Sequence, residues 1–192
     1  MIRIGIVGDI GSGKSYIARQ FGYPIFNADL EVAKIYKKNK KCFLSLKKEL
    51  PNFITNFPIQ KNDIFKAIQS NKKNLIKIVK VVHPEVRKNM KIFIKKNKTK
   101  KIVILDIPLL LENKINRKND IIVFVDAKRK EINKRLKKRK NFKFVNFKKL
   151  KKFQLPLEKK KKISDFIIIN NFKSNSAKKN VKQLLKKVLL NV

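Results

Sequence analysis

Eight consecutive residues near the start of the chain have the types and spacing of a phosphate-binding loop. Residues 8–15 read Gly-Asp-Ile-Gly-Ser-Gly-Lys-Ser and match the pattern G-x-x-x-x-G-K-[ST] in full. Backbone N–H groups of such a loop surround a phosphate, and the following helix adds partial positive charge. We expect Lys14 to reach the β- and γ-phosphates of a nucleotide such as ATP, and the Ser15 hydroxyl to bind Mg²⁺. The residues predicted to contact the nucleotide are Gly8, Gly11, Ser12, Gly13, Lys14, Ser15 and Tyr16.

The distribution of glycine supports this interpretation. All five glycines of the chain lie at or before Gly22. Glycine is retained where the backbone must adopt φ > 0 or approach a ligand closely. An accidental glycine turn before Lys-Ser is therefore disfavoured. The compact Gly-x-x-Gly-x-Gly-Lys-Ser spacing is common in small-molecule kinases, and no N-K-x-D sequence that would read guanine is present.

Two carboxylates follow apolar runs that have the character of strands. Asp106 ends Ile-Val-Ile-Leu-Asp, which is the Walker B pattern for orienting Mg²⁺, although a loop-capping carboxylate is the alternative. Asp29 follows a short strand at 25–26. Ligand groups gather at the carboxyl ends of strands, so Asp29 could accept a proton from an attacking hydroxyl. The alternative is an N-cap for a helix that starts at Leu30.

Basic side chains provide further candidates. Arg135 and Arg139 lie one turn apart on a predicted helix, and the planar guanidinium suits phosphate, although a solvated helix face is the alternative. His83 is the only histidine, which makes a zinc site improbable. It precedes Pro84, which we expect to start a helix, so the residues alone favour a structural capping role.

The elements that must position these residues alternate along the chain. Apolar runs predict strands at 2–7, 25–26, 102–105, 121–125 and 166–169, and helical patterns occupy 14–21, 30–36, 129–140, 144–153 and 177–190. This alternation predicts an α/β fold with a doubly wound, parallel, five-stranded sheet in one domain, 1–192. Residues 37–100 are mostly helical by pattern, with breaks at Pro51, Pro58 and Pro84. We expect an inserted helical subdomain at about 30–97.

Composition excludes several classes of protein. The formal net charge is +38, from 51 Lys and Arg against 13 Asp and Glu. Nucleic-acid binding would explain it, but the lysines are spread along the chain without a recognisable module, so compositional drift is favoured. One cysteine, Cys42, forbids an intrachain disulfide. With no apolar run of membrane-spanning length and no signal-like N-terminus, we expect a cytoplasmic protein, either a monomer or a small homo-oligomer.

Taken together, these motifs resemble the dephospho-CoA kinase family over nearly the whole chain. Residues 4–15 are similar to the family's opening "GLTGGIGSGKS", residues 27–29 to "DAD", His83-Pro84 to "HP", and residues 107–112 to "vPLLfE". The spacing of the last segment is similar to "Q…K…AD.vi.N", carried here by Gln154, Lys160, Asp165 and Asn170. Asp9 and Asn27 depart from the pattern, and Asn27 puts an auxiliary metal or substrate role there in doubt.

The resemblance implies transfer of phosphate from ATP to 3′-dephospho-CoA on a P-loop three-layer α/β/α core, with a helical substrate subdomain and a lid at about 128–160. It implies catalytic roles for Asp29, Lys14 and Arg139 and nucleotide contacts from Arg135 and Asn170. The substrate-binding residues that it implies are Asp29, His83, Arg87, Pro108 and Leu109. Two rivals remain open: another small-molecule kinase with a different acceptor pocket, and a basic nucleic-acid-binding NTPase.

Overall fold

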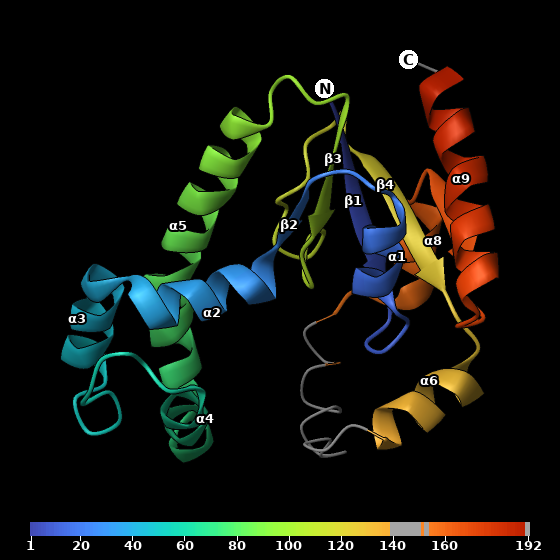
Figure 1. Ribbon diagram of the computed structural model, residues 1–192. Helices are drawn as coiled ribbons and strands as arrows, with labels where there is room; N and C mark the ends of the chain where they lie inside the picture. The colour runs from blue at the N-terminus through green and yellow to red at the C-terminus, as the bar shows by residue number, and fades with distance from the viewer. Residues whose placement is uncertain (139–150, 152–153, 191–192) are drawn as a thin grey trace. The chain divides into compact units, whose positions relative to one another are not determined.

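The computed structural model describes residues 1–138, 151 and 154–190. Five parallel strands form one sheet in the order β2-β3-β1-β4-β5. Figure 1 labels the first four strands of the chain in this sheet. The strands are β1 (Ile2–Gly8), β2 (Ile25–Asn27), β3 (Ile102–Asp106), β4 (Ile121–Asp126) and β5 (Phe166–Ile169). The predicted doubly wound parallel sheet is therefore confirmed. The strand β1 lies at the centre, with β2 and β3 on one side and β4 and β5 on the other, so the switch point lies at the carboxyl end of β1.

Helices cover both faces of the sheet. They are α1 (Lys14–Gln20), α8 (Leu157–Lys162) and α9 (Ser174–Leu190). The helix α6 (Arg129–Lys137) instead packs Ile132 and Leu136 against Gly11 in the loop after β1. On one face, α1 and α9 bury alternate strand residues such as Ile4 and Ile6 in a single core. On the other face, Gly5 has no side chain, which leaves room for Leu110 from the segment after β3. The sequence pattern did not predict α8. Most of the helix expected at 144–153 lies outside the described residues.

The chain divides into two compact units, residues 28–96 and the remainder. The smaller unit contains α2 (Ala28–Lys38), α3 (Lys40–Glu49), α4 (Lys61–Ser70) and α5 (Lys72–Lys96). It has its own apolar core, in which Leu46 and Ala67 are fully buried. Its limits lie within two residues of the insertion expected at 30–97. A substrate-binding role for this unit stays a prediction, as does a lid at 128–160.

One prediction about the smaller unit is wrong. The helix α5 runs without interruption through Pro84, which was expected to break it. A proline inside a helix removes one backbone hydrogen bond and costs about 3 kcal/mol. Burial of Ile78 and Val82 on the core side of the same helix can offset that cost. Tertiary packing has therefore overridden a local signal.

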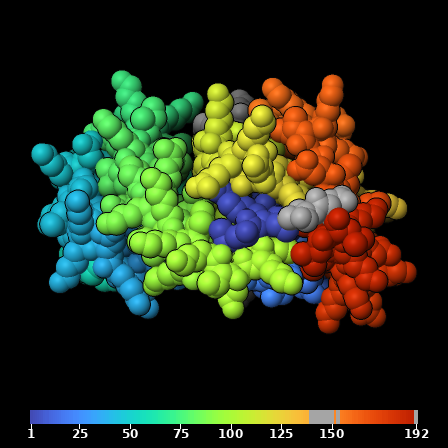
Figure 2. All heavy atoms as spheres, turned by 90° about the horizontal axis from the view of Figure 1, so that it is seen from above, coloured from blue at the N-terminus to red at the C-terminus, as the bar shows by residue number. Residues whose placement is uncertain are grey.

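The amino-terminal end of the sheet is held by a buried ion pair. Arg3 Nη2 lies 2.8 Å from Asp120 Oδ2, and the two side chains are 6% and 3% exposed. Asp120 also accepts a hydrogen bond from the backbone of Arg117 at 2.8 Å. Figure 2 looks onto this end, where the first residues of the chain lie beside the segment that leads into β3.

The strand β5 forms one edge of the sheet. Ile167 and Ile169 are 47% and 67% exposed on it, an unusual position for two large apolar side chains. Asn180 from α9 donates a hydrogen bond to the backbone oxygen of Ile169 at 2.9 Å. No helix in the described part of the chain is both long enough and apolar enough to cross a membrane.

Candidate active site

The loop between β1 and α1 has a backbone that only glycine can provide at two positions. Gly8 has φ +145°, and a Cβ placed there would lie 2.6 Å from the backbone oxygen of Val125. Gly13, with φ +90°, directly precedes α1, and a Cβ there would collide with the Asn170 amide. The sequence therefore keeps glycine here because the loop turns tightly against β4 and against the residue that follows β5.

Asn170, the residue after β5, holds this loop through side-chain hydrogen bonds. Its Nδ2 donates to the Ser12 backbone oxygen at 2.8 Å, and its Oδ1 accepts from the Phe172 backbone N–H at 3.0 Å. The residue is only 2% exposed. Both ends of this amide hydrogen-bond to the backbone, and the nucleotide contact that the resemblance implies for Asn170 stays a prediction. Asn170 therefore positions the loop.

Lys14 folds its ammonium group back over the loop. Its Nζ donates to the backbone oxygens of Asp9 and Gly8 at 2.7 and 3.3 Å. The Asp9 side chain, a departure from the family pattern, accepts from the Ile10 N–H at 2.8 Å. A cation held by neutral carbonyls exchanges them readily for the stronger charge of a phosphate.

The loop also contains an unusual hydroxyl. Ser12 is fully buried, and within the described chain its Oγ has no hydrogen-bond partner. Its backbone N–H donates to the backbone oxygen of Asp9 at 3.2 Å. Buried polar groups without a partner are uncommon, and a bound ion or ligand is one explanation for them. Together with the Gly8 and Gly13 geometry, this feature fits a cradle for an anionic group.

Asp106 lies at the carboxyl end of β3, in register with Asn27 at the end of β2. The Asn27 amide donates a hydrogen bond to Asp106 Oδ2, and Asp106 is only 4% exposed. The amide that replaces the family's first aspartate thus orients the neighbouring carboxylate. A hard cation such as Mg²⁺ needs only one or two protein oxygens, because phosphates and waters complete its shell. Ser15 in the first turn of α1 and Asp106 are groups of the right kind.

No cluster of three or more His, Cys, Asp or Glu residues that could hold a metal ion occurs in the described ranges. An all-protein metal cage is therefore not a feature of this part of the chain. A cation shared with bound phosphates remains the chemistry that these residues fit.

Asp29 lies in the first turn of α2, and its side chain is exposed. The N-cap alternative is wrong, because α2 starts at Ala28, directly after β2, and Asp29 is already helical. A carboxylate there benefits from the helix dipole. Two peptide units connect it to Asn27, so its Cα lies within about 7.6 Å of the Cα of Asn27.

His83 and Arg87 lie one turn apart on α5 and therefore share a face of that helix. The expected capping role for His83 is wrong, since the residue lies well inside the helix. Burial, and secondarily the charge of Arg87, lowers the pKa of His83 below its usual 6.5. The imidazole is accordingly neutral near pH 7 and can both donate and accept hydrogen bonds.

The turn after β3 presents Pro108, which is exposed, and Leu109, which is half-buried. Three residues further along, Glu112 forms an ion pair with Lys160 of α8 at 2.7 Å. Its Oε1 also accepts from the Leu155 backbone N–H at 3.0 Å. The sequence contained both charged residues in quoted motifs, but nothing in their spacing revealed that they pair. This contact ties the turn to the segment that precedes α8.

Arg135 on α6 stacks over the ring of Phe172, with its Cζ 4.4 Å from the ring centroid. Arg135 is nevertheless exposed, so both the nucleotide contact and the solvated helix face stay open. Phe172 was missed at the sequence level, although an aromatic residue two positions after Asn170 was a readable signal. It has a left-handed backbone, φ 62°, which is uncommon for a bulky residue. Arg139 lies outside the described residues.

Comparison with known proteins extends this picture. A sequence model described as dephospho-CoA kinase matches residues 2–176. A dephospho-CoA kinase from Wolbachia pipientis wMel is 33% identical, with 98% of each chain covered.

Solved structures resemble the chain over its whole length. One from Thermus thermophilus has a TM-score of 0.76 at 28% identity and covers 100% of this chain and 97% of its own. A dephospho-CoA kinase from Campylobacter jejuni has a TM-score of 0.66 at 21% identity, with 97% and 96% covered, and supports the fold.

Proposed function

Because the chain belongs to the dephospho-CoA kinase family, we propose that it transfers the γ-phosphate of ATP to the ribose 3′-hydroxyl of 3′-dephospho-CoA. The products are coenzyme A and ADP, and the reaction is the last step of coenzyme A biosynthesis. The observation that carries the proposal is the loop of residues 8–15, whose conformation requires glycine and which lies at the switch point of a parallel sheet. The chain that contains it matches the family over residues 2–176.

The nucleotide phosphates bind the loop in this proposal. Backbone N–H groups at the start of α1 donate to them, and the helix dipole adds attraction. Lys14 leaves the carbonyls of Gly8 and Asp9 and neutralises the β- and γ-phosphates. Asn170 keeps the loop in the conformation that directs these donors inward.

Asp29 acts on the acceptor. Its exposed carboxylate orients the 3′-hydroxyl and accepts its proton as the phosphorus–oxygen bond forms. His83, Arg87, Pro108 and Leu109 bind the acceptor, with Arg87 supplying charge and His83 a neutral hydrogen-bonding group. Arg135 binds the nucleotide, and Arg139 stabilises charge on the transferred phosphate.

Ser15 and Asp106 hold Mg²⁺ in this proposal, with Asn27 orienting the Asp106 carboxylate. When bound, the ion neutralises charge on the phosphates during transfer. We further propose a cytoplasmic monomer or small homo-oligomer without a nucleic-acid partner. The single cysteine and the absence of a recognisable nucleic-acid module in the sequence support that part of the proposal.

One coupled assay tests the proposal. ADP release is measured with ATP and each acceptor of a panel that includes 3′-dephospho-CoA, shikimate, gluconate and nucleoside monophosphates. Transfer to dephospho-CoA with the highest kcat/KM supports the proposal. A higher kcat/KM with another acceptor would establish the rival small-molecule kinase. ATP hydrolysis stimulated by nucleic acid, with a steep salt dependence, would establish the nucleic-acid-binding NTPase.

A further inference from the structure

The segment at 151–155, of which residues 151, 154 and 155 are described, contacts two loops of the larger compact unit. At one end, the backbone N–H of Leu155 donates to Glu112 Oε1 at 3.0 Å, in the turn after β3. At the other end, Lys151 Nζ lies 3.8 Å from Asp9 Oδ2, in the loop after β1. The Gln154 N–H donates to the Lys151 oxygen at 3.1 Å, so a fixed Leu155 restricts the position of Lys151.

Glu112 is itself held in place by a buried ion pair. Its Oε1 lies 2.7 Å from Lys160 Nζ, and the side chains of Lys160 and Glu112 are 2% and 10% exposed. Lys160 belongs to α8, and its backbone N–H donates to the Pro156 oxygen at 3.1 Å. Because a buried charge is costly without its partner, this pair has little freedom to separate. Glu112 is therefore a fixed point to which Leu155 is attached.

Asp9 is an unexpected residue in a loop that would bind an anion. It is the only acidic residue among positions 8–15, and it is buried. Its Oδ1 accepts from the Ile10 N–H at 2.8 Å, which keeps the carboxylate within the loop. Like charges repel, so an uncompensated Asp9 would weaken the binding of a triphosphate to this loop. A cation beside Asp9 removes that penalty.

Resting on the function proposed above, we propose that Glu112 is a positioning residue for the nucleotide site. It holds Leu155, and with it Lys151, so that the Lys151 ammonium group neutralises the Asp9 carboxylate. The loop then presents its N–H groups and Lys14 to the phosphates of ATP without an opposing charge. Glu112 contacts neither the nucleotide nor the reacting atoms in this proposal and acts only through Leu155 and Lys151.

A second buried ion pair of the same unit provides a matched control. Arg3 Nη2 lies 2.8 Å from Asp120 Oδ2. Asp120 also accepts a backbone N–H from Arg117, just as Glu112 accepts one from Leu155. The control pair lies at the amino-terminal end of the sheet, whereas the loop of residues 8–15 follows the carboxyl end of β1. The two pairs therefore match in burial and bonding and differ in what they are attached to.

The test measures the calorimetric Kd for ATP in the absence of an acceptor. Glu112→Met with Lys160→Met replaces the pair by apolar side chains, and Lys151→Met removes the cation directly. We expect each of these two proteins to raise the Kd on the order of tenfold, because a charge-compensating contact is lost. Arg3→Met with Asp120→Leu should lower the melting temperature but keep the Kd within twofold of wild type.

The decisive measurement adds Asp9→Asn to both weakened proteins. The amide still accepts the Ile10 N–H but carries no charge, so Lys151 has nothing left to neutralise. We expect the combined variants to recover a Kd within threefold of wild type, which a merely structural role of Glu112 would not produce. A Kd that stays raised about tenfold after Asp9→Asn would overturn the inference, as would an unchanged Kd in either protein before Asp9 is replaced.

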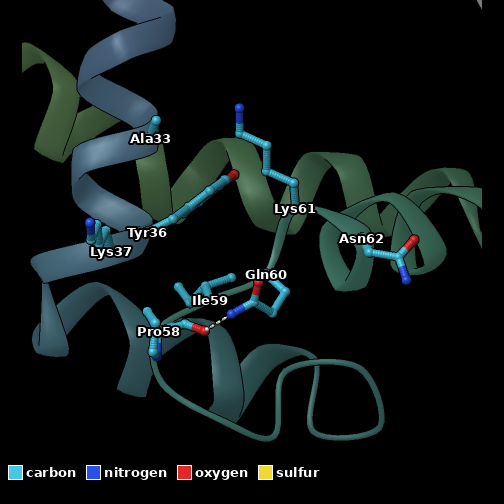
Figure 3. A pocket seen from close by; sticks show the side chains of 8 residues that line it. All are labelled: Ala33, Tyr36, Lys37, Pro58, Ile59, Gln60, Lys61 and Asn62. Atoms are coloured by element: carbon cyan, nitrogen blue, oxygen red, sulfur yellow. Dashed lines mark hydrogen bonds between the residues drawn. The ribbon is translucent and has the colours of Figure 1, made fainter. Parts of the chain in front are cut away.

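Two further variants keep the test decisive. Leu155→Pro removes the N–H that Glu112 accepts without changing the buried pair, so it serves where the double Met variant is unfolded. Lys61→Met removes one charge from the lining of a cavity of about 480 Å³ in the smaller unit, shown in Figure 3, and should keep the Kd for ATP within twofold of wild type. A rise equal to that of Lys151→Met would overturn the inference, because net charge and not position would then set the affinity. Failure of the proposed function is a different result, in which the wild-type protein transfers no phosphate from ATP to dephospho-CoA.

Discussion

The side-chain amide of Asn170 donates a hydrogen bond to the backbone oxygen of Ser12 at 2.8 Å, although 158 positions separate the two residues in the sequence. The residue after the last strand thus fixes the loop after the first strand. Phosphate-binding loops act by presenting N–H groups that are already oriented, so a distant anchor has a direct effect on chemistry. We therefore expect Asn170 to be a positioning residue, which acts on a bound nucleotide through the loop.

Replacement of this amide tests the anchor. Asn170→Ala leaves the Ser12 oxygen and the Phe172 N–H without their partner, and we expect a loss of about 1–3 kcal/mol in unfolding free energy. The KM for ATP should rise and kcat should fall, while the KM for dephospho-CoA changes little. Asn170→Asp keeps the acceptor for Phe172 but not the donor to Ser12. If Asp restores ATP binding fully, the Ser12 contact is not the one that matters.

Lys14→Ala should abolish transfer and leave the fold intact. The ammonium group donates to the backbone oxygens of Gly8 and Asp9, and we expect the side chain to bury little apolar surface. Loss of such a preorganised charge costs on the order of 10²–10³ in rate or more. The measurement is kcat at saturating ATP, with the circular dichroism spectrum and melting temperature as controls. Near-normal turnover would contradict the assignment of Lys14 and its loop as the phosphate-binding site.

Asp29→Asn separates a catalytic carboxylate from a helix-stabilising one. The structure places Asp29 within the first turn of α2, so the neutral amide forfeits about 0.3–1 kcal/mol of interaction with the helix dipole. Loss of a general base typically costs about 10²–10⁴ in rate, and a loose transition state would favour the lower end. The variant should melt close to wild type, bind ATP normally and fail in turnover. Activity within threefold of wild type would mean that the base lies elsewhere.

The Arg3–Asp120 pair should matter for stability and not for chemistry. It is buried at the amino-terminal end of the sheet, whereas the phosphate-binding loop lies at the carboxyl end of β1. Asp120→Ala leaves a buried guanidinium without its partner, which costs about 3–5 kcal/mol. Urea unfolding measures this loss. A matched change at an exposed pair, Glu49→Ala beside Lys77, should cost less than about 1 kcal/mol.

His83 should impose a pH dependence on stability. Burial, followed by the charge of Arg87, holds its folded pKa below 6.5, so the unfolded chain binds the proton more readily. Its contribution to stability is complete above pH 6.5 and is lost as the pH falls through the folded value. Since the chain has one histidine, its NMR titration needs no assignment. The variant His83→Gln should show a smaller fall in melting temperature between pH 7 and pH 5 than the wild type does. An imidazole pKa at or above 6.5 contradicts this prediction.

Much of the fold and the loop could be predicted because local chemistry dictates them. Apolar runs buried on both faces read as parallel strands, and the glycines mark positions such as Gly8 where a Cβ has no room. Pro84 was misinterpreted because its penalty is local, while the packing of Ile78 and Val82 that offsets it is tertiary. A start of α2 at Leu30 was expected, two residues later than the structure has it. The chain instead passes directly from Asn27 into the helix.

Contacts between distant segments lay beyond sequence reasoning. Glu112 and Lys160 were visible as charged residues, but their pairing depends on how α8 packs beside the turn after β3. The stack of Arg135 on Phe172 likewise requires two segments to meet. In each case the residue type was informative, but only the folded structure shows its partner.

Because the edge at β5 is exposed, the large net charge affects whether copies of the chain associate. A strand edge with two exposed isoleucines is a template on which another copy can add a strand. Mutual repulsion between chains of net charge +38 opposes that encounter. The range of this repulsion shrinks from about 10 Å at 0.1 M salt to about 3 Å at 1 M. Salt therefore weakens the protection against self-association, and we expect the lysines to keep the chain in solution whatever the origin of their number.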